Sequence, residues 1–149
     1  MTTEAVDRAV RLFVFEHFVE TTLPPSVAET AEALAITLAE SIAAYYRLAS
    51  NHVLVLEPGT HEIRMANPLS AVPTAFPVSI GEKRYYGSCA WDAFGVIAML
   101  GGSGTVHSSC GCCGEAMTLE INHLELRPIE GVVHFAVPAA QWWDDIVFT

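Results

Sequence analysis

The chain has 149 residues, of which 52% are hydrophobic and 16% are charged, and its formal net charge is −10. This length suits one compact domain or two small ones, and the apolar content is too high for a disordered chain. Acidic residues outnumber basic ones in both halves of the chain. That balance argues against nucleic acid as a partner, because phosphate contacts need clustered Lys and Arg.

The sequence also argues against a membrane protein. No apolar run approaches the roughly 18 residues needed to span a bilayer, and the N-terminus lacks the basic and apolar segments of a signal peptide. We therefore expect a cytoplasmic protein. In that compartment its four cysteines are expected to be reduced, which favours metal binding or catalysis over disulfide bonds.

The first 50 residues predict three helices. Residues 4–20 have an amphipathic pattern, with Val6, Val10, Phe13 and Phe18 on one side, and consecutive prolines follow at 24–25. Ser26 and Thr37 each precede a glutamate by three positions, a capping-box spacing that predicts two more helix starts. The helix that starts at Thr37 is expected to place Leu38, Ile42, Tyr45 and Ala49 on one stripe.

Residues 52–56 and 61–66 predict a hairpin, because Pro58 and Gly59 between them suit a type II turn. Three helices followed by a hairpin form a winged-helix pattern. One interpretation is DNA binding through the third helix. The other is a helical scaffold without a DNA role, which we favour because Arg47 is the only basic residue of that helix.

Residues 67–77 contain three prolines and predict an extended linker to a second unit. A buried helix is expected over residues 89–100, ending at the glycines that follow. Short strands are expected around it at residues 78–80, 83–86, 105–108, 116–121, 124–126 and 132–137.

Cys89 and Asp92 lie three positions apart at the start of the predicted helix 89–100. Residues at this spacing share a helix face, and a thiol in the first turn meets the positive end of the helix dipole, which favours thiolate. A neighbouring carboxylate can take the thiol proton and return it later. The alternative is that Cys89 is a small buried hydrophobe and Asp92 an ordinary first-turn acid.

Cys110, Cys112 and Cys113 lie within four residues and are flanked by glycines. Such a loop can turn its sulfurs toward one soft metal ion, although it does not match a zinc ribbon, because a second cysteine pair is absent. A purely structural role is the weaker alternative, because adjacent cytosolic thiols are open to oxidation.

Several segments together resemble the alkylmercury (organomercurial) lyase family, and they extend over nearly the whole chain. The segments are residues 58–63, 65–68, 71–74, 86–93 and 142–146. The Cys89-Ala90-Trp91-Asp92 segment is the most specific of them.

The resemblance implies an α+β fold, with a winged-helix-like helical domain at residues 1–70 and a mixed α/β lyase-like domain with short antiparallel strands at residues 71–149. It implies cleavage of a carbon–mercury bond to a hydrocarbon and Hg(II), with Cys89 as the first catalytic cysteine and Asp92 as the catalytic aspartate. No cofactor is expected beyond Hg(II) as bound product, and Hg(II) would pass through thiols to mercuric reductase.

The resemblance also implies a second catalytic cysteine, which the family places directly after the position that Thr149 occupies. We therefore expect either a truncated form or a protein that has lost the second thiol or carries it elsewhere in the chain. Cys110, Cys112 or Cys113 could share a mercury ion with Cys89.

Three functions remain open from the sequence. The first is an organomercurial lyase. The second is a non-catalytic soft-metal (mercury) thiol-binding protein that uses Cys89 and the loop thiols as ligands. The third is a metal-responsive winged-helix regulator, which the acidic balance argues against.

Overall fold

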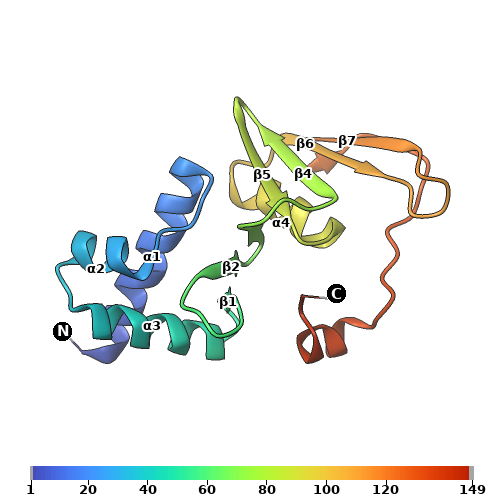
Figure 1. Ribbon diagram of the computed structural model, residues 1–149. Helices are drawn as coiled ribbons and strands as arrows, with labels where there is room; N and C mark the ends of the chain where they lie inside the picture. Colours follow the sequence, from blue (N-terminus) through green and yellow to red (C-terminus); the bar gives the residue numbers. More distant parts are fainter. Residues whose placement is uncertain (1, 148–149) are drawn as a thin grey trace. The chain divides into compact units, whose positions relative to one another are not determined.

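The computed structural model describes residues 2–147. The chain divides into two compact units, Met1–Val72 and Pro73–Thr149. The first is mainly helical, and the second combines an α-helix and a short 3₁₀ helix with an antiparallel sheet (Figure 1). The predicted α+β class is confirmed.

The first unit begins with the helices α1 (Thr3–Thr21), α2 (Val27–Leu34) and α3 (Leu38–Ser50). Both predicted capping boxes are present: Ser26 and Glu29 cap α2, and Thr37 and Glu40 cap α3. In each box the hydroxyl and the carboxylate accept backbone N–H groups that the first helical turn leaves without partners.

The buried faces of α1 and α3 differ in detail from those predicted. On α1 the buried residues follow a spacing of four, and Val14 takes the place expected for Phe13. On α3 the prediction was wrong for Leu38, which is 50% exposed. The buried face of α3 instead consists of Ser41, Ala44, Tyr45 and Leu48.

The buried face of α3 is polar at its contact with α2. Ser41 Oγ donates to the Val27 carbonyl at 2.9 Å. The Tyr45 hydroxyl lies 2.7 Å from Thr30 Oγ1 and donates to the Pro25 carbonyl at 3.0 Å. These buried polar groups are stable because they form hydrogen bonds. A prediction from hydrophobicity alone misses them and therefore places the buried face of α3 incorrectly.

A three-stranded antiparallel ladder completes the first unit. β1 (Leu54–Leu56) pairs with β2 (Ile63–Ala66), and β2 pairs with β3 (Leu69–Ser70). Gly59 in the predicted turn has φ +73°, which a type II turn requires. The predicted linker 67–77 was partly wrong, because β3 and the first residues of β4 lie within it.

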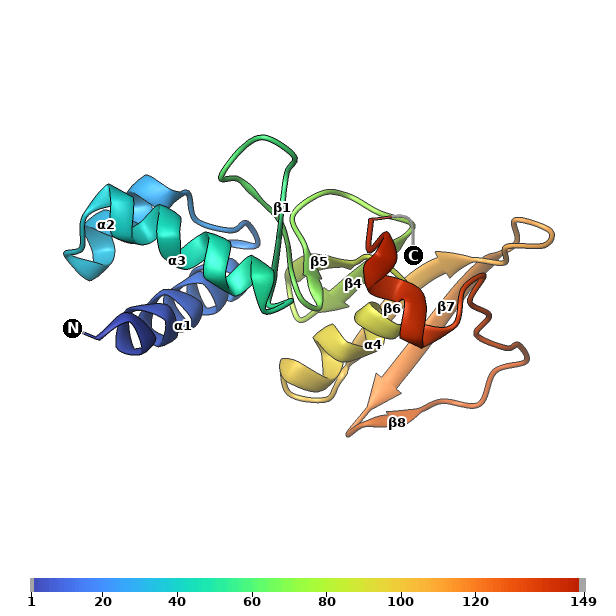
Figure 2. The same ribbon diagram turned by 90° about the horizontal axis from the view of Figure 1, so that it is seen from below.

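The second unit is an antiparallel sheet with the order β5-β4-β6-β7-β8. Its strands are β4 (Phe76–Ile80), β5 (Lys83–Gly87), β6 (Gly104–Ser109), β7 (Ala116–Asn122) and β8 (Glu125–Leu126). Helix α4 (Ala90–Met99) packs on β4, β5 and β6 (Figure 2). Alternate strand residues Val78, Tyr85 and Val106 form the core with Val96 and Ile97 of α4.

The predicted strand at residues 132–137 was wrong. This segment has no regular structure and pairs with no strand among the described residues. Val132 is 93% exposed, so the apolar pattern there is not matched by burial. A short 3₁₀ helix, Ala139–Asp144, follows and was not predicted.

The apolar residues near the C-terminus are covered to different degrees. Trp142 is half-buried, packs on Phe135 with ring centroids 5.0 Å apart, and donates its indole N–H to the Val137 carbonyl at 2.9 Å. Trp143 is 39% exposed, Ile146 is half-buried, and Phe148 lies outside the described residues. None of the helices described over residues 2–147 has the length and apolar character needed to cross a membrane.

Candidate active site

The Cys89–Asp92 pair stands at the junction of β5 and α4. Cys89 is the N-cap residue of α4, with an extended backbone (φ −147°, ψ 179°), and Asp92 lies in the first turn. Both side chains are partly buried. The two side chains interact with each other. The helix start therefore brings the predicted thiol and carboxyl together.

Close packing of backbone against backbone holds this junction. Gly87 at the end of β5 is buried, and a Cβ there would lie 2.4 Å from the Ala93 nitrogen and 3.0 Å from the Asp92 carbonyl carbon. Only glycine allows the strand to approach the first turn of α4 this closely. The Thr74 hydroxyl donates to the Gly87 carbonyl and fixes the end of the strand.

The pKa of Cys89 is shifted in the direction opposite to the one predicted from the helix dipole. Burial raises the pKa of the Cys89 thiol above its ordinary value, and the charge of Asp92 adds to the rise. The backbone N–H groups of Asp92 and Trp91 act in the opposite direction but are outweighed. Because burial outweighs these N–H groups, the helix start stabilises the Cys89 thiolate less than the sequence indicated.

The pKa of the Asp92 carboxyl is also raised. Burial raises its pKa, while the Ser88 N–H and the Cys89 side chain act to lower it. A raised pKa on both partners means that the pair retains a proton more firmly than two exposed groups would. A carboxyl of this kind is suited to deliver a proton to a reacting atom.

The three other cysteines lie at the tip of the β6–β7 hairpin. Cys110 is partly buried, and Cys112 and Cys113 are exposed. Hydrogen bonds from the backbone N–H groups of Cys113 and Cys112, and from the Cys113 thiol, lower the pKa of Cys110. Cys110 and Cys113 are three positions apart, a Cys-x-x-Cys spacing that our sequence analysis overlooked.

The four cysteines do not form part of a preformed metal site with three or more ligands in the described residues. Across residues 2–147, no group of three or more His, Cys, Asp or Glu side chains is arranged to hold a metal ion. The sharing of one mercury ion between Cys89 and the loop therefore stays a prediction.

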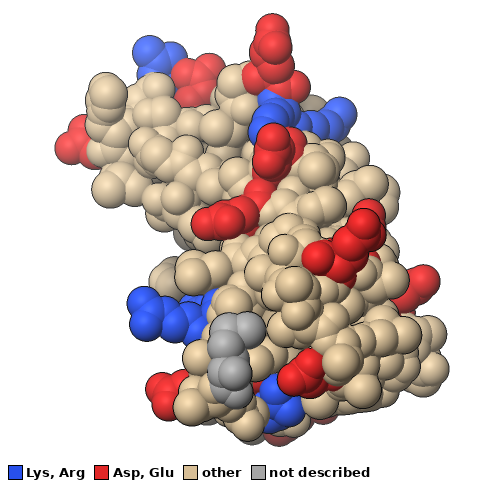
Figure 3. All heavy atoms as spheres, turned by 90° about the vertical axis from the view of Figure 1, so that its left-hand side faces the viewer, with Lys and Arg blue, Asp and Glu red and all other residues tan. Residues whose placement is uncertain are grey.

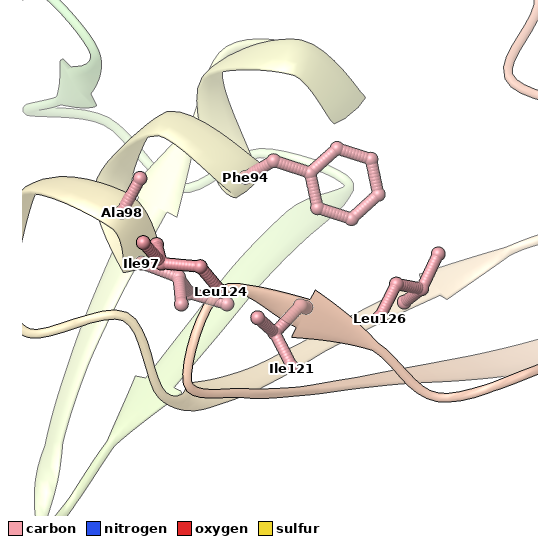
Figure 4. A pocket seen from close by; sticks show the side chains of 6 residues that line it. All are labelled: Phe94, Ile97, Ala98, Ile121, Leu124 and Leu126. Carbon is pink, nitrogen blue, oxygen red and sulfur yellow. The ribbon is translucent and has the colours of Figure 1, made fainter.

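An apolar groove of about 230 Å³ lies in the same unit, between α4 and the β7–β8 hairpin (Figure 4). Its lining residues are Phe94, Ile97, Ala98, Ile121, Leu124 and Leu126. Neither Cys89 nor Asp92 lines it, so the groove is not evidence for a substrate pocket at the pair.

The fold of this chain is similar to that of a protein of known structure. The chain is similar to a solved protein described as the mercury-bound form of MerB2, with 19% sequence identity and a TM-score of 0.65. The match covers 83% of this chain and 58% of that one, so the chain spans little more than half the length of that relative. At this identity the likeness shows the fold. No curated protein matches the sequence.

The family comparison covers the whole second unit. The model of the MerB family, described as alkylmercury lyase, matches residues 69–149, which is more than half of the 149 residues. The matched region contains the Cys89–Asp92 pair and the three cysteines of the hairpin tip. The resemblance inferred from the sequence is thereby confirmed, and this chain belongs to the alkylmercury lyase family.

Proposed function

We propose that this protein cleaves carbon–mercury bonds by protonolysis, with Cys89 and Asp92 as its catalytic residues. The observation that carries the proposal is the contact between a partly buried thiol and a partly buried carboxyl at the start of α4. Membership of the alkylmercury lyase family supports it.

The two side chains have complementary tasks in this reaction. The Cys89 sulfur attacks mercury, for which a soft thiolate is the preferred ligand, and its proton passes to Asp92. Asp92 then protonates the carbon as the carbon–mercury bond breaks, which releases a hydrocarbon and leaves Hg(II) on sulfur. A second thiolate on mercury adds electron density to the metal and makes carbon a better leaving group.

We propose two sources for that second thiolate: a cysteine of the hairpin tip, Cys110, Cys112 or Cys113, or a small thiol from solution. Hg(II) as product would then leave through thiol exchange, with mercuric reductase as the proposed acceptor. We propose a cytoplasmic location for this chemistry, where small thiols are abundant.

The first unit is proposed to be a winged-helix-like scaffold without a DNA role. Its three helices and antiparallel ladder have the expected order. Arg47, the one basic residue of α3, is held by Asp7 through hydrogen bonds of 2.6–3.0 Å. A guanidinium engaged in this way is not free for phosphate.

The second candidate is a non-catalytic mercury-binding protein. Its supporting observation is the exposure of Cys112 and Cys113, which makes both thiols available to soft metals in solution. Both candidates bind mercurials, but only a lyase releases hydrocarbon.

The test is benzene release from phenylmercury in the presence of excess small thiol, measured by gas chromatography. We expect benzene from the parent chain and none above background from Cys89→Ser. Tight stoichiometric binding of phenylmercury without benzene would replace the lyase proposal with the binding-protein candidate.

A further inference from the structure

The tip of the β6–β7 hairpin brings two cysteines together at an exposed turn. β6 and β7 pair up to Ser109 and Ala116. The turn between them is closed by two bonds of 2.8 Å, from the Cys110 N–H to the Glu115 carbonyl and from the Gly114 N–H to the Cys110 carbonyl. Gly114 has φ +75°, which lets the chain turn back after Cys113.

The sulfur of Cys110 is the centre of this turn. It accepts hydrogen bonds from the backbone N–H groups of Cys113 and Cys112 and from the Cys113 thiol. Successive N–H groups that point at one atom form a nest for negative charge. The contact of the two sulfurs places Cys113 as the direct neighbour of the Cys110 sulfur.

Cys112 differs from both, although it lies between them in the sequence. It is exposed, and only its backbone N–H contributes to the environment of the Cys110 sulfur. In this turn Cys110 and Cys113 are therefore in contact, and the Cys112 thiol is outside that contact.

We propose that Cys110 and Cys113 form a thiol–disulfide exchange pair, in which Cys110 is the nucleophile and Cys113 the resolving thiol. The substrate class is a small aliphatic disulfide. This inference is independent of carbon–mercury cleavage and does not involve Cys89 or Asp92. Its structural basis is the sulfur contact, the N–H groups around Cys110 and the accessibility of the hairpin tip.

The exchange takes place in two balanced steps. The Cys110 thiolate attacks one sulfur of the small disulfide, its S–S bond breaks, and one small thiolate leaves, so that Cys110 carries a mixed disulfide. The Cys113 thiolate then attacks the Cys110 sulfur and expels the second small thiolate. Two cysteine thiols are oxidised to one disulfide, and the small disulfide is reduced to two thiols that take the two cysteine protons.

The position of the pair fits a reversible modification site. Thiols that respond to oxidants are accessible, have thiolate character and lie beside a resolving cysteine. Cys113 is exposed, and the closed turn places Cys110 beside it, whereas Cys89 is partly buried and has a carboxyl, not a second thiol, as its neighbour. We therefore expect exchange at the hairpin tip before exchange at Cys89.

The experiment uses the full chain at neutral pH with 2-hydroxyethyl disulfide, a neutral probe. Released thiol gives the rate, and mass spectrometry with peptide fragmentation locates the product after free thiols are blocked. The parent and Cys112→Ser should both form a Cys110–Cys113 disulfide. Cys113→Ser should accumulate a mixed disulfide on Cys110, and Cys110→Ser should react slower, by roughly tenfold.

Two outcomes would overturn the proposal. One is a Cys112→Ser variant that loses the intramolecular disulfide, and the other is a Cys113→Ser variant that gives no lasting adduct on Cys110. Circular dichroism of each variant shows that the hairpin substitutions leave the fold intact. Benzene release by Cys110→Ser and Cys113→Ser reports on carbon–mercury cleavage separately, so failure of one idea does not imply failure of the other.

Discussion

At the scale of single residues, the pKa values of two cysteines in the second unit, Cys89 and Cys110, are shifted in opposite directions. Burial and the neighbouring Asp92 raise the pKa of Cys89, while hydrogen bonds from neighbouring residues lower the pKa of Cys110. The type of residue is the same, so that the difference comes from desolvation in one case and from N–H donors in the other.

The pH dependence of alkylation follows from these directions. A raised pKa means that Cys89 loses its proton at a higher pH than an ordinary thiol, and a lowered pKa means that Cys110 loses it at a lower one. We expect the rate of Cys110 alkylation by iodoacetamide to level off at lower pH than the rate of Cys89. Mass spectrometry of time courses between about pH 6 and 10 measures both. The reverse order would contradict the environments described for the two sulfurs.

The role of Asp92 is tested by Asp92→Asn, which removes the proton carrier and keeps the shape. We expect unchanged phenylmercury binding and a loss of benzene release of about 10²–10⁴-fold, the usual contribution of a positioned general acid. Glu82→Gln, at an exposed position of the β4–β5 turn, is the matched control and should retain activity. Cleavage at the parent rate would remove Asp92 from the mechanism.

At the scale of elements, the site depends on how closely β5 approaches α4. The chemical groups lie on the helix, but their position is fixed by a strand residue without a side chain. Gly87 leaves room for the Asp92–Ala93 backbone, and Thr74 ties the end of the strand. The atoms that a Cβ at position 87 would meet belong to the backbone of α4, so no flexible side chain could move aside to make room for it.

Gly87→Ala should therefore separate β5 from the first turn of α4. We expect a loss of stability of about 1–3 kcal/mol, as for other overpacked sites, together with loss of benzene release. Urea unfolding and the gas chromatography assay measure the two effects. Gly111→Ala is the matched control, because a Cβ there would meet no atom within 4 Å. Equal stability of the two variants would show that the junction can relax.

At the scale of the whole molecule, the charge distribution limits the partners. The net charge is −10, and on the face in Figure 3 the Lys and Arg side chains lie in small groups among acidic ones. Arg47 on α3 is bound by Asp7. A helical unit of this composition lacks the clustered cations that phosphate binding requires.

We therefore expect no retardation of duplex DNA in a low-salt mobility shift, up to about 100 μM protein, a concentration at which non-specific DNA binders are bound. Asp7→Asn, which releases Arg47, is the informative companion variant, and it should also fail to bind because one free cation is not a cluster. A salt-dependent shift with the parent chain would restore the regulator hypothesis.

The sequence determined what local chemistry can specify. Capping boxes at Ser26 and Thr37 predicted two helix starts, because the orphan N–H groups of a first turn need partners within three residues. The segment around Cys89 and Asp92 predicted the family and placed the two side chains together, since residues three apart share a helix face. These features need no distant partner.

Only the tertiary structure decided the features that depend on distant groups. Residues 132–137 have a strand-like composition, but no strand in the described part of the chain pairs with them. The buried face of α3 is shifted because the Tyr45 hydroxyl contacts Thr30 and Pro25. The direction of the Cys89 pKa follows the burial of the site rather than its place on the helix. Burial and hydrogen-bond partners far apart in sequence are set by the assembled fold, and a pattern along the chain does not contain them.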